Sequence, residues 1–186
     1  MAGALKRVFD AQDGHPGAGF DLPGYRLLVS SLFSSPASIV PGGVAGILTP
    51  YLCWLSTGMS LFMTLTVLVS AVVALRIMTV IAYRGRDHSS DSYAETKRWD
   101  REYFLGATVF SIVLGYSCYA ALALTDDAAA HITSVASTIA LASGYVSRNA
   151  GRPKFVAVQL LAFCIPMAFG LIQAHNVYYQ YIGYFA

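Results

Sequence analysis

Four stretches of this chain contain no Asp, Glu, Lys or Arg. They cover residues 27–75, 103–125, 128–147 and 155–186. A charged side chain in the hydrocarbon of a bilayer costs roughly 2.5 to 3.5 kcal/mol even on insertion scales, so a membrane selects for such stretches. The pattern predicts an all-α protein built as a polytopic transmembrane helical bundle.

The apolar stretches are long enough for five full spans and the start of a sixth. A helix needs about 20 residues to cross the hydrocarbon, and polar turns separate the runs. The predicted full spans are residues 37–55, 59–83, 103–124, 129–147 and 154–173. A last apolar run at 177–186 is only ten residues long. It predicts a partial span, and we expect the natural protein to continue beyond Ala186.

The first part of the chain has a different character. Residues 1–24 are polar and rich in Gly, Asp and Pro, which predicts a flexible tail. Residues 25–35 combine leucines and a phenylalanine with serines, a pattern typical of a short helix lying at the membrane interface. The transmembrane domain is therefore predicted to cover residues 25–186, with the interfacial helix as its first element.

Local signals also predict where the third spanning helix begins. Ser92 and Glu95 have the spacing of a capping box, in which a serine hydroxyl and a glutamate carboxylate satisfy each other's backbone amides. A helix should start there and run into the third span. Arg98 and Glu102 are then four residues apart on one face and form an ion pair.

The distribution of cations predicts the orientation of the bundle. Eleven of the twelve Lys and Arg residues lie in the N-terminal segment up to Arg26, in the 84–101 loop or in the 148–154 turn. These segments alternate with cation-free turns at residues 56–58, 125–127 and 174–176. By the positive-inside rule the N-terminus is cytoplasmic, and a sixth span would return the chain to the cytoplasm.

Composition agrees with a membrane protein and argues against nucleic acid as a partner. Of the 186 residues, 56% are hydrophobic and 12% charged, where a soluble domain has about 25% charged residues. The net charge of +2 is too small to indicate nucleic-acid binding. The three cysteines, Cys53, Cys118 and Cys164, lie far apart in apolar runs and have no metal-ligand spacing, so we interpret them as packing residues.

Three pieces of the sequence resemble one known family. They are the turn Ser147–Pro153 with Gln159 after it, the segment Leu75–Ile77 with Tyr83–Arg84 closing the same helix, and the segment Lys97–Tyr103 before an apolar span. Their order and spacing resemble the N-terminal membrane region of bacterial diguanylate cyclases, proteins with a C-terminal GGDEF domain and often an EAL domain. The turn, with the sequence SRNAGRP, is the most specific of the three.

The resemblance implies a six-span sensory and anchoring region in the bacterial inner membrane. Such a region would regulate a downstream cytosolic output domain that makes, and sometimes degrades, cyclic di-GMP. Cyclase domains of this family act as dimers, so a homodimer is implied as well. This chain contains no GGDEF or EAL sequence. No catalytic residue is therefore carried over, and the chain would be the input half of its parent protein.

Arg76 is the sharpest candidate for a functional residue, because it is the one charged residue in the interior of a predicted span, away from its ends. It lies about two turns from the end of the second span, and helical side chains lean toward their own N-terminus, which here is away from the cytoplasm. We therefore expect it to face the bundle. Residues at matching depth on neighbouring helices are Gln159, Ser143 and Ser111. The site would be a polar switch or a ligand contact, and the alternative is a structural arginine that fixes helix order.

The turn between the fourth and fifth spans is a second candidate site. Its residues are Arg148, Asn149, Gly151, Arg152 and Pro153. Asn and Gly tolerate the backbone of a tight turn, and Pro is favoured at the first position of a helix. The turn would couple the bundle to the output domain or to lipid phosphates. The alternative is turn chemistry combined with a positive-inside anchor.

Two histidines lie at the predicted outer ends of the fourth and fifth spans. If His131 and His175 approached each other they could ligate haem or a metal. Isolated interfacial histidines that face water are the alternative, so no cofactor and no metal is assigned.

Two further function classes stay open. A small membrane transporter or channel would normally show broken helices and paired half-sites, which are not visible in the sequence. A haem or redox membrane subunit would depend on the two outer histidines.

Overall fold

Every regular element that the structure describes is an α-helix. The computed structural model describes residues 22–34, 36–88, 90–149, 152–174 and 177–185. Its helices are α2 (Leu22–Ser34), α3 (Pro36–Thr57), α4 (Ser60–Arg84), α5 (Tyr93–Leu124), α6 (Ala128–Arg148), α7 (Pro153–Gln173) and α8 (Val177–Phe185). The prediction of an all-α fold is confirmed.

Helix starts follow the local signals in the sequence. The predicted capping box is present: the Ser92 side chain accepts a hydrogen bond from the Glu95 amide, and the Ser92 amide donates to the Glu95 carboxylate at 2.8 Å. Pro153 takes the first position of α7, as predicted. The Arg98 Nε donates to Glu102 Oε1 at 2.9 Å, so the expected ion pair on α5 also forms.

The interfacial helix begins earlier than predicted. α2 starts at Leu22, three residues before the predicted start at Tyr25, because Pro23 is tolerated in the first turn of a helix where an amide would have no partner anyway. Residues 22–24 therefore belong to α2 and not to the predicted tail. The rest of that tail, residues 1–21, lies outside the described residues.

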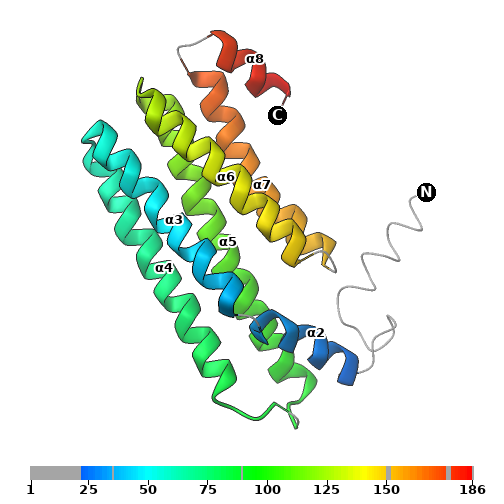
Figure 1. The fold of residues 1–186 in the computed structure, drawn as a ribbon. Helices are drawn as coiled ribbons and strands as arrows, with labels where there is room; N and C mark the ends of the chain where they lie inside the picture. Colours follow the sequence, from blue (N-terminus) through cyan, green and yellow to red (C-terminus); the bar gives the residue numbers. More distant parts are fainter. Residues whose placement is uncertain (1–21, 35, 89, 150–151, 175–176, 186) are drawn as a thin grey trace, which may run out of the picture.

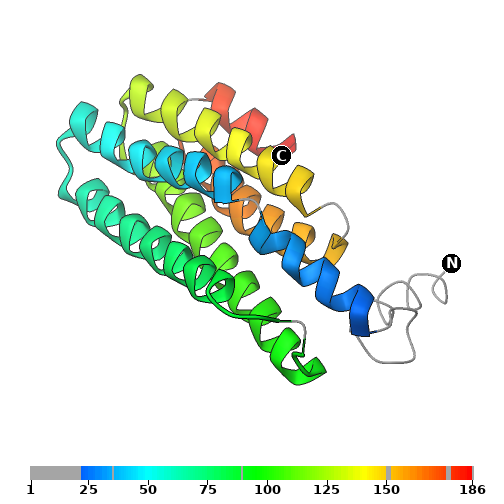
Figure 2. The same cartoon turned by 60° about the horizontal axis from the view of Figure 1, so that its bottom comes forward.

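Five long helices lie side by side and α5 is at their centre (Figure 1). α5 contacts α3, α4, α6 and α7, and it also contacts α2. α2 lies across one end of the bundle in both views (Figures 1 and 2). We call this end, where α2, the α4–α5 loop and the α6–α7 turn meet, the α2 end.

The chain passes back and forth between the two ends of the bundle. α4 ends at the α2 end and α5 begins there, as do the end of α6 and the start of α7 (Figure 1). The partial span predicted at residues 177–186 corresponds to α8, nine residues that pack on α7 at the opposite end. Gly183 lies so close to α7 that a Cβ there would stand 2.9 Å from Ile172 Cγ1.

Four of the helices are long and apolar enough to cross a membrane. The qualifying segments are Ile39–Thr57 of α3 and the whole of α4, α5 and α7. α6 matches the fourth predicted span in position and has 21 residues, but its serines, threonines and His131 lower its hydropathy, and it does not qualify. Many large apolar side chains on these helices point outward, among them Leu75 and Ile81, as expected for a surface that faces lipid.

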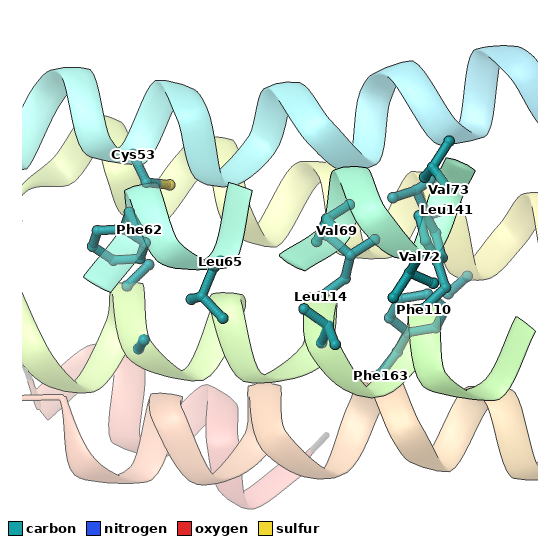
Figure 3. Packing of buried hydrophobic residues seen from close by; sticks show 14 of the residues in the cluster. Cys53, Phe62, Leu65, Val69, Val72, Val73, Phe110, Leu114, Leu141 and Phe163 are labelled. Atoms are coloured by element: carbon teal, nitrogen blue, oxygen red, sulfur yellow. The ribbon is translucent and has the colours of Figure 1, made fainter. Parts of the chain in front are cut away.

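The interior is a continuous apolar core that all five long helices build. Figure 3 shows Cys53 from α3, Phe62 and Val69 from α4 and Phe110 from α5, with residues of α6 and α7. The phenylalanines of this core are almost completely buried. A second cluster lies under α2 and contains Val29, Leu32, Phe33, Ile39, Val80, Tyr83 and Tyr103. α2 is thus packed onto the bundle by apolar contacts.

Small residues allow the closest helix contact. A Cβ on Gly115 of α5 would lie 2.2 Å from the backbone oxygen of Ala162 on α7, a distance that no side chain can occupy. The backbone of α7 cannot move away from this point without opening the core, because Phe163 beside it is fully buried. Gly115 is therefore required for the packing of α5 against α7.

We predict that Gly115→Ala destabilises the bundle by about 1–3 kcal/mol, because the added methyl group overpacks the α5–α7 contact. Gly144→Ala is the matched control, since a Cβ at Gly144 meets nothing within 4 Å. It should be neutral or stabilise by up to about 1 kcal/mol through helix propensity. Unfolding in a mild detergent measures both, and equal stability of the two variants would contradict the packing.

Candidate functional site

Arg76 on α4 points into the bundle and is surrounded by aromatic side chains. Its Nη1 donates a hydrogen bond to the hydroxyl of Tyr145 on α6 at 2.7 Å. Its Cζ lies 6.0 Å from the ring centroid of Tyr103, 5.3 Å from that of Phe110 and 5.8 Å from that of Tyr145. A cation near aromatic faces is stabilised by the ring quadrupoles. Arg76 thereby joins α4 to α5 and α6.

The three polar residues that we expected beside Arg76 form hydrogen bonds with other partners. Ser111 and Ser143 donate to carbonyls four residues earlier in their own helices, at 3.0 and 2.9 Å. Gln159 is fully buried and its Oε1 accepts from Asn149 Nδ2 at 3.3 Å. Ser143 is two residues from Tyr145, which places the two side chains on nearly opposite faces of α6. Tyr145, and not Ser143, therefore reaches Arg76.

The α6–α7 turn is tied to α2 and to α5. Arg148 Nη2 donates to the backbone oxygen of Leu32, one of the last carbonyls of α2, which have no partner within the helix. The backbone N–H of Asn149 donates to Tyr145 O at 3.0 Å and closes α6. Gly151 lies outside the described residues. The described part of the turn thus holds the end of α2 on the bundle.

Arg152 belongs to a buried polar network that connects three elements. Its Nη1 forms an ion pair with Asp100 Oδ1 on α5, and the side chains of Arg152 and Asp100 are only 8% and 16% exposed. The second oxygen of Asp100 accepts from the hydroxyl of Tyr25 on α2 at 2.9 Å. Burial, and next the Asp100 carboxylate, raise the pKa of Tyr25 above its usual range, so this phenol keeps its proton and donates.

A stack of aromatic rings that the sequence analysis did not predict lies beside this network. The rings of Phe33 and Tyr83 stack at 4.0 Å and those of Tyr83 and His88 at 3.9 Å, while Trp99 meets Tyr83 edge-on at 5.4 Å. The His88 Nδ1 lies 2.6 Å from Asp91 Oδ2, and its Nε2 lies 2.6 Å from Tyr83 O. Each ring nitrogen of His88 thus faces an oxygen acceptor.

This stack fixes the α4–α5 loop to α2. Phe33 comes from α2, Tyr83 from α4 and Trp99 from α5. Arg26 of α2 also donates to the backbone oxygen of Asp91. One signal in the sequence pointed to the His88–Asp91 contact. His88 stands three residues before Asp91, directly ahead of the Ser92 capping box. The α2 end is consequently one connected layer of aromatic and polar contacts.

His131 lies at the opposite end of the bundle. Its Nε2 donates to the backbone oxygen of Thr125 at 2.9 Å, and its ring meets that of Tyr179 on α8 edge-on at 5.5 Å. His175 lies outside the described residues, so its approach to His131 stays a prediction. Among the described residues no three His, Cys, Asp or Glu side chains gather as metal ligands.

Comparisons of the chain with known protein families, with curated proteins and with solved structures found no match.

We predict that Asp100→Ala destabilises the bundle by about 3 kcal/mol, because it leaves the buried Arg152 without its counter-ion and removes the acceptor of Tyr25. The matched control is Glu102→Ala, two residues further along α5, which removes an exposed pair with Arg98 and should cost no more than about 0.5 kcal/mol.

Protease cleavage in α2, measured together with the unfolding midpoint, reports whether α2 detaches in Asp100→Ala. Similar losses of stability in the two variants would show that the Asp100 network contributes no more than a surface ion pair.

Proposed function

We propose that this chain is a membrane input module that anchors and regulates a cytosolic domain of the cyclic di-GMP type, located in the bacterial inner membrane with its α2 end in the cytoplasm. The observation that carries the proposal is the connected layer at the α2 end. There α2, the α4–α5 loop and the α6–α7 turn are joined by the Asp100 network and by the aromatic stack around Tyr83.

The layer has the connections that signal transmission needs. A displacement of α4 or α5 inside the membrane would change the position of α2 through Tyr83 and Asp100. A displacement of α6 would do so through Arg148, which donates to Leu32 O. Small helix shifts at packed interfaces are a common switching mechanism. A homodimer is part of the proposal, because regulation would act through rearranged helices in a pair of cyclase domains.

Charge supports the orientation. Cations are concentrated at the α2 end. The end of α4, the α4–α5 loop and the start of α5 carry Arg84, Arg86, Lys97, Arg98 and Arg101. The end of α6, the α6–α7 turn and the start of α7 carry Arg148, Arg152 and Lys154. The turns at the opposite end carry no Lys or Arg. α6 lies alongside α3, α5 and α7 with a similar length, so we place it in the membrane as a fifth span.

The intact mass of the natural gene product tests this function. We expect a mass well above 20.0 kDa, with a GGDEF-type sequence after Ala186. A natural product of 20.0 kDa would contradict the proposal and would favour a transporter or a redox subunit.

If the output domain is present, the cyclic di-GMP content of cells that express the full-length protein reports the coupling. Asp100→Asn should change this content, because it breaks the network at the α2 end, whereas Glu102→Gln should not. Unchanged output in both variants, with equal amounts of protein in the membrane, would contradict coupling through this layer.

A further inference from the structure

A groove of about 400 Å³ runs between α3 and α6, with residues of α4 and α5 at its base. Its walls are mostly small or apolar, and include Gly42, Ala45, Leu141 and Gly144. Polar atoms concentrate at its α2 end, where Arg76, Tyr145 and Arg148 border it. This volume is within the usual range for ligand sites, roughly 300–1,000 Å³. The groove thus has a cationic head and an apolar tail.

The positive charge of Arg76 has no acidic partner in the part of the chain that the structure describes. The ion pairs recorded among those residues involve Arg86, His88, Arg98 and Arg152. The guanidinium has five N–H donors, and its recorded hydrogen bond is the one to the Tyr145 hydroxyl. A charge held within a span normally pairs with an opposite charge, so an anion in the groove would complete the site.

A second, independent observation comes from Tyr103. This residue is only 5% exposed, and its hydroxyl has no hydrogen-bond partner among the described residues. Its ring lies against two cations, with Arg76 Cζ at 6.0 Å and Arg148 Cζ at 5.7 Å. Tyr103 and Arg76 also border a smaller cavity of about 190 Å³ between α4 and α5. A buried donor without a partner is costly. Tyr103 borders this smaller cavity and not the groove itself, so its hydroxyl indicates a missing acceptor on the α4–α5 side of the two cations.

The apolar part of the groove is open at Gly144. Gly144 borders the groove, and a Cβ added at this residue meets no atom within 4 Å. From Tyr145 the groove continues along α6 to Ser137, eight residues or about 12 Å away. This length and the small walls suit part of an acyl chain.

We propose that the groove between α3 and α6 binds an anionic phospholipid, with its phosphate at Arg76 and Arg148 and an acyl chain along Gly42, Leu141 and Gly144. The guanidinium fork matches phosphate oxygens in a bidentate manner. Arg148 is the last residue of α6 and Arg76 lies eight residues, about 12 Å, inside α4. Arg148 thus lies near the level of the phosphates of the adjacent leaflet, and a phosphate that also contacts Arg76 is drawn below that level into the groove. The site does not depend on any output domain.

Native mass spectrometry of the detergent-solubilised chain, titrated with phosphatidylglycerol or with phosphatidylcholine of the same acyl chains, tests the site. We expect phosphatidylglycerol to bind at least about tenfold more tightly. Arg76→Gln should weaken it by about 10- to 100-fold, since hydrogen bonds to charged groups contribute at this scale. Arg101→Gln removes an exposed cation from α5 and should leave the affinity unchanged.

A second pair of variants tests the acyl chain and does not touch the buried charge. Gly144→Leu fills the groove and should abolish the preference for phosphatidylglycerol, whereas Ser143→Leu, on the exposed neighbouring position, should retain it. Equal affinity for both lipids in the unmodified chain, or equal binding by these two variants, would overturn the proposal. Tighter binding of oleate than of phosphatidylglycerol would overturn the assignment to a phospholipid.

Discussion

The hydrocarbon of a bilayer offers no hydrogen-bond partner, so a polar side chain inside the bundle is costly unless the protein or a bound molecule supplies one. Serines and threonines find a partner locally, as when Thr66 donates to Phe62 O and Ser111 to Ala107 O. The Arg76 side chain is long and charged, so a backbone carbonyl of its own helix cannot satisfy it in this way. It is held across the bundle by a hydrogen bond to Tyr145 and by aromatic faces of α5 and α6. This contact sets the rotation of α4 against its neighbours.

The two ends of the bundle differ because polar groups are concentrated at one of them. At the α2 end Asp100 receives hydrogen bonds from α2 and from Arg152, and Tyr83 is stacked between Phe33 and His88. These contacts join α2, the α4–α5 loop and the α6–α7 turn into one layer. The proposed lipid site adjoins this layer, so that lipid charge and helix position would influence the same set of side chains.

The sequence was sufficient for the elements but not for their side-chain partners. Charge-free stretches and the Ser92 capping box predicted the helices and the start of α5, because both signals depend on neighbours in the chain. The partner of Arg76 depends on helix rotation, which no local pattern contains, and Tyr145 was therefore missed. The same holds for His88, whose ring contacts are supplied by Tyr83 of α4 and Trp99 of α5. Hydropathy also predicted a fifth span at α6, a helix whose serines leave it less apolar than the other four.

The central claim is that these helices cross a membrane with the α2 end in the cytoplasm. Its most direct test is the labelling of single cysteines by a membrane-impermeant maleimide in bacterial cells, after Cys53, Cys118 and Cys164 have been replaced by Ala. Ser90→Cys probes the exposed α4–α5 loop and Asp126→Cys the exposed α5–α6 turn. The account predicts labelling of Asp126→Cys in intact cells and of Ser90→Cys only after permeabilisation. Labelling of both positions from the same side would contradict it.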